Sequence, residues 1–171
     1  MLRFLLLFPI LFMSACSTQM ATYDYATDTA FTGYKTYAIQ QSRKQANQSL
    51  DSGRIEAAIK SSLQGRYQIA EADQADMLVS YYLQPEVKAK QSGLSLGFGF
   101  GSGPVGVGVS TSPPVKQETE ARLMLDIIDT ASSNVVWTAK ANRNLENDMK
   151  PPVRSDLIND LVTEMLGNFP P

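Results

Sequence analysis

Several carboxylates lie two or three residues apart in this chain, and two neighbouring acids can share a proton or bind a cation. Asp126 and Asp129 lie three residues apart in a segment typical of a β-strand. Residues three apart in a strand point to opposite faces, so these two carboxylates are not expected to meet. We predict that Asp129 shapes a turn and that Asp126 lies on the solvent face of the strand.

Glu118 and Glu120 share one face of the same predicted strand, with Cα atoms roughly 7 Å apart. This spacing suits acid–base chemistry or a Ca²⁺ site. However, Lys116 and Arg122 flank the two acids on that face, and such a pattern is typical of an ordinary charged strand. We therefore predict a solvated face here rather than a site.

The remaining candidates for catalysis are weak in this sequence. Asp73 and Asp76 precede a predicted strand, where aspartate is common for its local hydrogen bonds. The chain contains no histidine to activate a serine. A Ser–Lys pair, for example Ser61 with Lys60, stays open, but nothing in the sequence singles out one such pair. We expect no catalytic residue, no metal ion and no cofactor, and we expect that the protein is not an enzyme.

The N-terminal segment carries a more specific signal. The apolar run at residues 4–13 is too short to span a bilayer, which needs about 20 residues, but it suits an export signal. Met13-Ser14-Ala15-Cys16 then resembles the processing motif of bacterial lipoproteins, in which two small residues precede a cysteine that receives lipid. An ordinary secretory signal with an incidental cysteine is the competing interpretation.

Lipidation of Cys16 would account for the single cysteine, which cannot form an internal disulfide. We predict a signal peptide at residues 1–15, a lipidated tether at 16–22 and one folded domain at 23–171. Two or more acyl chains hold a protein stably on a membrane. In enterobacterial sorting, aspartate after the lipidated cysteine favours retention in the inner membrane. Ser17 occupies that position here, so for a Gram-negative source we expect an outer-membrane anchor facing the periplasm.

The composition indicates a folded domain without a nucleic-acid surface. Hydrophobic residues make up 43% of the 171 residues, which is enough for the core of one domain. The formal net charge of −2 gives no basic footprint of the kind that binds nucleic acid. The expected contacts are the membrane, through Cys16, and a protein partner in the envelope.

Local patterns predict the strands and helices of the domain. Asp51 looks like the N-cap of an amphipathic helix that closes at Gly65, and Pro152 suits the first turn of a C-terminal helix. The clearest hairpin joins a strand at 115–129 to a strand at 135–141. Further strands are predicted at residues 22–25, 34–39, 67–69 and 77–84.

This order of elements predicts an α+β fold. Two amphipathic helices can cover one face of a mostly antiparallel sheet, which gives a two-layer sandwich. Trp137 is predicted to be a core anchor, because a large aromatic ring on the apolar face of a strand is most often buried. The tyrosines of the predicted strands are interpreted as sheet packing rather than as a binding platform.

Residues 93–112 alternate glycine with apolar residues on both sides of Ser102-Gly103-Pro104, a pattern that predicts a β-ribbon excursion with a tight turn. Glycine offers no side chain to bury, so the ribbon would be weakly fixed in register. It is either an excursion that tolerates any sequence or an edge that pairs with another chain or touches the membrane. In the second case its contacts would be Phe98, Phe100, Val105, Val107 and Val109.

In combination, these landmarks resemble the DUF4136 lipoproteins, a bacterial family of unassigned function. The similarity covers Tyr23-Asp24-Tyr25, the segments at 31–38, 75–82, 123–129 and 135–137, and the ending Phe169-Pro170-Pro171. Asn134 stands where the family commonly has glycine in the hairpin turn, and asparagine can take the same left-handed conformation. The resemblance implies an envelope address and an α/β sandwich, and it implies no catalytic residues.

The expected function is that of an envelope lipoprotein acting as a non-catalytic periplasmic binding or envelope-maintenance module. Two alternatives stay open. One is a homo-oligomeric scaffold built through the glycine-rich ribbon, and the other is a hydrolase that works without histidine.

Overall fold

The structure, a computed structural model, describes residues 19–42, 49–90 and 116–171, with the backbone alone described at 87–90 and 116–119. The bounds of the elements are β1 Ala21–Tyr25, β2 Thr36–Gln41, α1 Leu50–Leu63, β3 Gln68–Ile69, β4 Met77–Lys90, β5 Lys116–Asp129, β6 Val135–Leu145 and α2 Pro151–Gly167, with a short 3-10 helix at Phe31–Gly33. The predicted order of strands and helices is confirmed. The predicted ribbon at 93–112 lies outside the described residues.

The strands form one mixed sheet in the order β1-β6-β5-β4-β2-β3. Antiparallel pairs join β1 to β6, β6 to β5 and β5 to β4, whereas β2 is parallel to both β4 and β3. The parallel pairs arise because α1 carries the chain back along the sheet between β2 and the later strands. As a result β2 lies near one edge of the sheet, where two-residue β3 covers only Thr36 and Tyr37.

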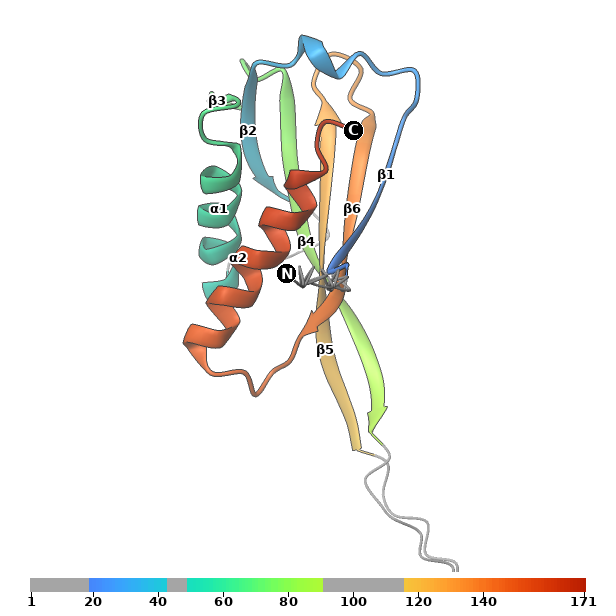
Figure 1. Ribbon diagram of the computed structural model, residues 1–171, viewed down its shortest axis with the longest axis vertical. Coiled ribbons are helices and arrows are strands. Elements are labelled where there is room, and N and C mark those ends of the chain that lie inside the picture. Colours follow the sequence, from blue (N-terminus) through green and yellow to red (C-terminus); the bar gives the residue numbers. More distant parts are fainter. Residues whose placement is uncertain (1–18, 43–48, 91–115) are drawn as a thin grey trace, which may run out of the picture.

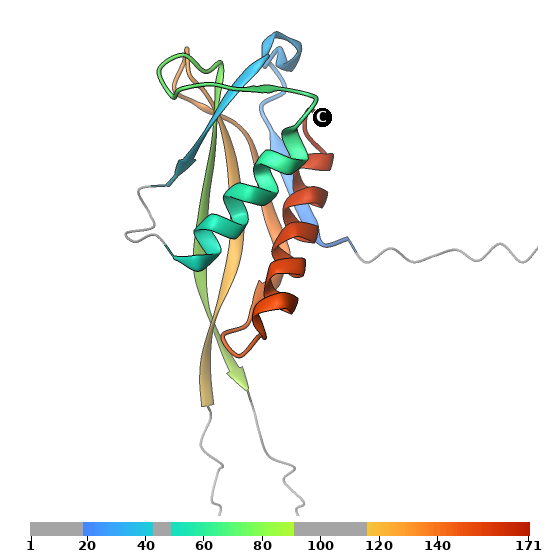
Figure 2. The same cartoon turned by 90° about the vertical axis from the view of Figure 1, so that its left-hand side faces the viewer.

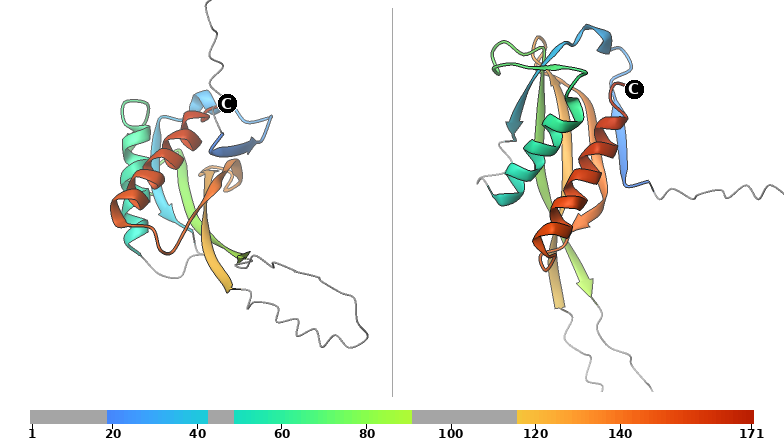
Figure 3. Two further views of the ribbon diagram at one scale, coloured as in Figure 1. Left: turned by 60° about the horizontal axis from the view of Figure 1, so that its bottom comes forward. Right: turned by 60° about the vertical axis from the view of Figure 1, so that its left-hand side comes forward.

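Both helices lie on one face of this sheet, next to each other (Figures 1 and 2). Figure 3 gives two further views of the same two layers. The core lies between the layers and takes alternate residues of the strands, as with Leu123, Leu125 and Ile127 of β5. The facing stripe of α2 contributes Ile158 and Leu161. The expected α+β sandwich is therefore confirmed.

The N-cap of α1 differs from the prediction. Ser49, not Asp51, begins the helix, because its Oγ accepts a hydrogen bond from the Ser52 amide at 3.3 Å. The Ser52 hydroxyl in turn accepts from the Ser49 amide at 3.1 Å, which completes a capping box. Gly65 has φ +81°, so the predicted glycine ends the helix in the left-handed conformation.

The hairpin turn between β5 and β6 also differs in one residue. Ser133, with φ 59°, takes the left-handed conformation that was predicted for Asn134. The Asp129 amide donates to the Asn134 carbonyl at 2.9 Å, which closes the turn directly before β6 begins at Val135. The left-handed residue therefore comes one position earlier.

Strand β4 continues past Gln84, where the sequence predicted its end. β4 and β5 pair residue by residue as far as Lys90 and Lys116, and Pro85 lies within this stretch opposite Ala121. The Tyr81 carbonyl faces β2, because it accepts from the Ser42 amide at 2.9 Å, so odd-numbered residues of β4 point that way. The absent N–H of Pro85 therefore removes no hydrogen bond to β5, and proline is tolerated there.

Among the described residues, no helix has both the length and the apolar character needed to cross a membrane.

Candidate binding groove

A groove of about 570 Å³ lies between α1 and the β2 side of the sheet. Ala38 and Ile39 line it from β2, Glu56 and Lys60 line it from α1, and residues 69–72 complete the lining. Figure 2 shows α1 crossing the sheet on this side. The volume lies in the range of typical ligand sites, roughly 300–1,000 Å³. We call this feature the α1–β2 groove.

Strand β2 presents main-chain groups to this groove. β3 pairs with β2 only as far as Tyr37, whereas β4 pairs with it as far as Gln41. The Tyr37 carbonyl points outward, because it accepts a hydrogen bond of 2.9 Å from the Ala70 amide. Main-chain direction repeats at every second residue of a strand, so the N–H and C=O of Ile39 point outward as well. In the described part of the chain, neither group has a hydrogen-bond partner.

A buried tyrosine fixes one acidic side chain of the groove. Tyr81 of β4 is fully buried, and its hydroxyl donates a hydrogen bond of 2.7 Å to Oε1 of Glu56. Burial and the hydrogen bond to Glu56 raise the pKa of Tyr81 to about 12, so the hydroxyl remains a donor at neutral pH. No described residue donates to Oε2 of Glu56, which leaves this oxygen able to accept a hydrogen bond from a bound molecule.

The groove carries two acidic side chains and one basic side chain, those of Glu56, Glu71 and Lys60. Lys60 follows Glu56 by four residues, a spacing that permits an ion pair on a helix. Within the described ranges no ion pair joins them, and Glu71 has no side-chain partner either. An occupant of the groove therefore meets one more negative than positive charge.

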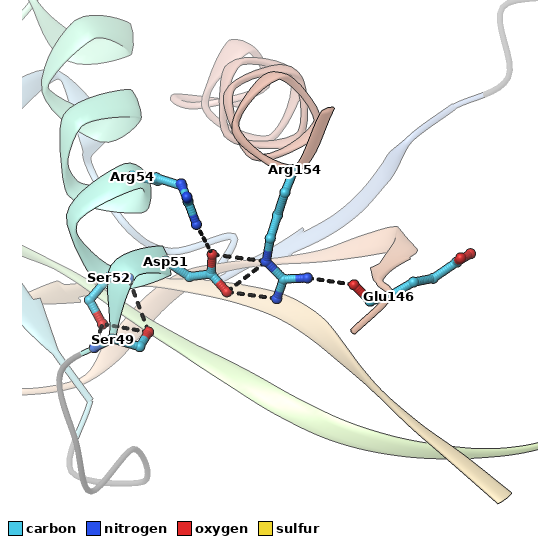
Figure 4. Close-up of polar contacts among 6 residues, drawn as sticks. All are labelled: Ser49, Asp51, Ser52, Arg54, Glu146 and Arg154. Carbon is cyan, nitrogen blue, oxygen red and sulfur yellow. Dashed lines mark hydrogen bonds and ion pairs between the residues drawn. The ribbon is translucent and has the colours of Figure 1, made fainter. Parts of the chain in front are cut away.

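A buried ion pair positions the start of α1 against α2 (Figure 4). Arg154 donates three hydrogen bonds of 2.6–2.9 Å to the carboxylate of Asp51 and a fourth, of 2.6 Å, to the Glu146 carbonyl. Arg54 adds a bond of 2.7 Å to Asp51. Burial alone would raise the pKa of Asp51, but the two guanidinium groups outweigh it and hold the pKa below its usual range. These contacts are internal to the fold, so the cluster is structural.

The acids of the late hairpin have the predicted separate roles. Asp129 accepts bonds of 3.0 and 2.6 Å from the amide and hydroxyl of Ser132, and the hydroxyl bond lowers the pKa of this carboxyl. The prediction that Asp129 shapes the turn is confirmed. Asp126 lies on the sheet face away from the helices and accepts a bond of 2.7 Å from the hydroxyl of Thr138, its cross-strand neighbour.

The prediction that Glu120 lies on a solvated face is wrong. Glu120 is 3% exposed and accepts a hydrogen bond of 2.8 Å from the Asn144 amide group. Asn144 also donates to Glu86 at 3.1 Å, and Arg122 donates to Glu86 at 2.6 Å. This network joins side chains of β4, β5 and β6, and the Arg122 and Glu86 side chains in it remain 22% and 27% exposed. The side chain of Glu118 lies outside the described part.

Asp76 makes long-range contacts rather than the local ones that were predicted. Its Oδ2 accepts bonds of 2.9 Å from the amides of Lys35 and Thr36 and from the Thr36 hydroxyl. The two backbone bonds hold the pKa of Asp76 below its usual range. The carboxylate therefore fixes the start of β2. Lys60 and Ser61 are both exposed on α1, and no hydrogen bond between them is found in the described ranges.

Trp137 is a core residue, as predicted. It is 1% exposed and packs edge-on against Phe169, with ring centroids 5.5 Å apart. Tyr23 stacks beside it at 6.4 Å, and Tyr25 continues the row, yet these two tyrosines remain 42% and 41% exposed. The indole Nε1 of Trp137 is buried and has no hydrogen-bond partner among the residues described.

Several predicted positions fall outside the described residues. They are the lipidation site Cys16 and the ribbon contacts Phe98, Phe100, Val105, Val107 and Val109. Within the described ranges, no group of three or more acidic or cysteine side chains is arranged to hold a metal ion.

Sequence reasoning missed the groove, because the sequence does not show that the helix beginning near Asp51 lies beside the strand at 34–39. One signal could have indicated it. The predicted strand at 67–69 is only half as long as the predicted strand at 34–39, so it could cover only part of that strand if the two were neighbours. The sequence does not show that they are neighbours.

The protein is thus a small α+β sandwich with a groove beside the parallel strands of its sheet. The family model described as a domain of unknown function, DUF4136, matches residues 21–171. The chain belongs to the DUF4136 family, and the resemblance found in the sequence is confirmed. No curated protein matches the chain.

One solved structure is similar in fold at low sequence identity. A PDZ domain protein from Parabacteroides distasonis superposes with a TM-score of 0.56 at 16% identity, over 88% of this chain and 35% of that one. This chain thus spans about a third of that protein, and the likeness concerns the fold alone. Weaker likenesses are the PelC dodecamer from Paraburkholderia phytofirmans, with TM-score 0.47, 15% identity and coverage of 85% and 93%, and protein XCC0632 from Xanthomonas campestris, with 0.40, 8%, 78% and 82%.

Proposed function

We propose that this protein is a non-catalytic binding module of the bacterial cell envelope, held on the outer membrane by lipid on Cys16 and facing the periplasm. The anchor is supported by the sequence Met13-Ser14-Ala15-Cys16 behind the apolar run at 4–13. A lipid anchor keeps a binding domain within reach of the membrane surface without a spanning helix.

The observation that carries the binding role is the α1–β2 groove. It combines an open volume of about 570 Å³ with charged side chains and the outward main-chain groups of Ile39. The acids Asp51, Asp76 and Glu120, by contrast, accept hydrogen bonds from within the fold. Acids engaged in this way stabilise structure, which favours binding over carboxylate catalysis.

Two measurements on the full chain test the proposal. The first is the mass of the mature N-terminal peptide, which should include acyl chains on Cys16. A Cys16→Ser variant should lack these chains and should not be found in the membrane fraction. An unmodified thiol at Cys16 would contradict the proposed lipid anchor.

The second measurement is chemical crosslinking in intact cells, followed by identification of captured proteins. The control is an unrelated soluble domain fused behind residues 1–22, which would share the anchor but not the fold. At least one envelope protein should be enriched with the full chain over this control. Equal capture by both would contradict a binding role.

A homo-oligomeric scaffold is the second candidate, and one observation favours it. β4 and β5 extend beyond the helices as a two-stranded ribbon (Figure 1), and over residues 86–90 and 116–119 the structure describes no third strand paired with them. Such edges can pair with another chain. Light scattering of a form lacking residues 1–16 would show an oligomer, and replacing residues 86–119 with a short turn would disperse it. A monomer in both forms would exclude the scaffold.

A further inference from the structure

We infer that the α1–β2 groove binds an extended segment of a partner protein as an added strand beside β2, and that this segment carries apolar residues and a lysine or arginine. The inference rests on the proposed binding function and names its occupant. It follows from two independent features of the groove, the direction of the β2 main chain and the charges that face the groove.

The first feature is the strand edge. Ile39 directs its N–H and C=O away from β4, and β3 ends before it reaches this residue. A neighbouring strand lies about 4.8 Å away in the hydrogen-bonding direction. An added chain at that spacing would occupy the groove beside α1, where it could form two main-chain bonds with Ile39. Peptides commonly bind at exposed sheet edges in this way.

The second feature is the chemistry of the groove lining. Ile69 is 60% exposed at one side and offers an apolar contact. Glu56 is held in place by Tyr81 and keeps Oε2 available, while Glu71 lies on the loop that follows β3. The excess of one negative charge favours a segment with a basic side chain among apolar ones. Lys60 disfavours a segment with several basic residues.

A short capped peptide, acetyl-Val-Thr-Lys-Thr-Val-amide with a fluorophore, is the probe. Alternate residues of a strand face the same way, so its valines and lysine can face α1 together. We expect binding in fluorescence anisotropy, and about fivefold weaker binding when glutamate replaces the lysine. Glu71→Gln should weaken binding of the lysine peptide about threefold, whereas Asp148→Asn, an exposed acid outside the groove, should leave it unchanged.

Backbone methylation of the probe tests strand addition itself. Only every second residue of an added strand directs its N–H toward β2. One peptide is N-methylated at both threonines, and a second is N-methylated at the lysine and the last valine. Exactly one of the two should lose affinity, by about fivefold for each hydrogen bond removed. On the protein, Ile39→Pro removes the outward N–H and should weaken binding similarly, whereas Ile39→Ala keeps it.

Three results would overturn the inference. The first is the absence of binding up to about 1 mM peptide, and the second is an equal loss of affinity for both methylated peptides. The third is a dimer of the free chain that Ile39→Pro dissociates, because a second copy of the chain would then occupy the groove. The methylated peptides decide the question even if Ile39→Pro fails to fold. A partner captured in cells equally by wild type and Glu71→Gln would remove the groove as its site and leave the proposed function standing.

Discussion

Arg154 of α2 and Asp51 of α1 lie 103 residues apart in the chain and are joined by three hydrogen bonds of 2.6–2.9 Å. Both side chains are largely shielded from solvent, at 15% and 10% exposure. Removing one member of a buried ion pair leaves the other charge without compensation, and this usually costs more than the pair contributes. The pair therefore makes the packing of α1 on α2 sensitive to single substitutions.

Arg154→Met should lower the free energy of unfolding by about 3 kcal/mol, because it leaves the Asp51 carboxylate buried beside Arg54 alone. Urea titration followed by circular dichroism measures the change. The matched control is Arg54→Met, which removes a more exposed partner of the same carboxylate and should cost about 1 kcal/mol or less. Equal losses of unfolding free energy in the two variants would show that the ion pair between α1 and α2 contributes no more to stability than the more exposed contact with Arg54.

Asp51 should also make stability depend on pH in the acid range. The folded-state pKa of this carboxyl lies below its ordinary value of 3.8, so the ionised form stabilises the fold. That contribution is present above about pH 4 and is lost as the pH falls through the folded pKa. The difference in unfolding free energy between wild type and Asp51→Asn should shrink as the pH is lowered from about 5 to 2. A constant difference would contradict the assigned shift, and the comparison cancels the similar contributions of Asp76 and Asp129.

Trp137 offers a test of an unsatisfied buried donor. Its Nε1 has no partner among the described residues, and a buried N–H without a partner costs about 1–3 kcal/mol. Trp137→Phe removes this donor along with part of the ring, so the two effects should nearly cancel and the melting temperature should change little. Trp137→Ala should cost about 3–5 kcal/mol, because it opens a cavity beside Phe169. A large loss in Trp137→Phe would indicate that the indole N–H is bonded.

The hydrogen bond between Tyr81 and Glu56 predicts a coupling between the core and the groove. Tyr81→Phe should cost about 1 kcal/mol of stability and should weaken binding of the lysine peptide about twofold, because Glu56 is then free to adopt other rotamers. In a Glu56→Gln background the same substitution should leave the peptide affinity unchanged. A double-mutant cycle on the dissociation constant measures this coupling. Independent effects of the two substitutions would contradict the positioning role of Tyr81.

The parts of the fold that sequence could predict are those set by local patterns. The strand predicted at 115–129 corresponds to β5, and the turn predicted after Asp129 corresponds to its hairpin with β6. Gly65 marked the end of α1 through its left-handed conformation. In each case neighbours in sequence determine the structure, so the pattern is sufficient.

The parts that sequence could not predict depend on pairing between distant segments. The parallel pairing of β2 with β4 follows from a crossover through α1, and no local pattern specifies that register. Asp76 was expected to bond locally, yet its partners lie some 40 residues earlier. Glu120 was expected on a charged strand face, yet it is buried and accepts a hydrogen bond from Asn144 of β6, 24 residues later in the chain. The groove depends on the same long-range arrangement.

Amide hydrogen exchange at Ile39, followed residue by residue by NMR, shows whether a bound peptide adds a strand to β2. In the free protein the Ile39 amide should exchange quickly, while Ala38 and Gln40, which face β4, should be protected. Saturating peptide should slow exchange at Ile39 and leave Ala38 and Gln40 as they were. An Ile39 amide already protected in the free protein, or one unchanged by bound peptide, would contradict strand addition at β2.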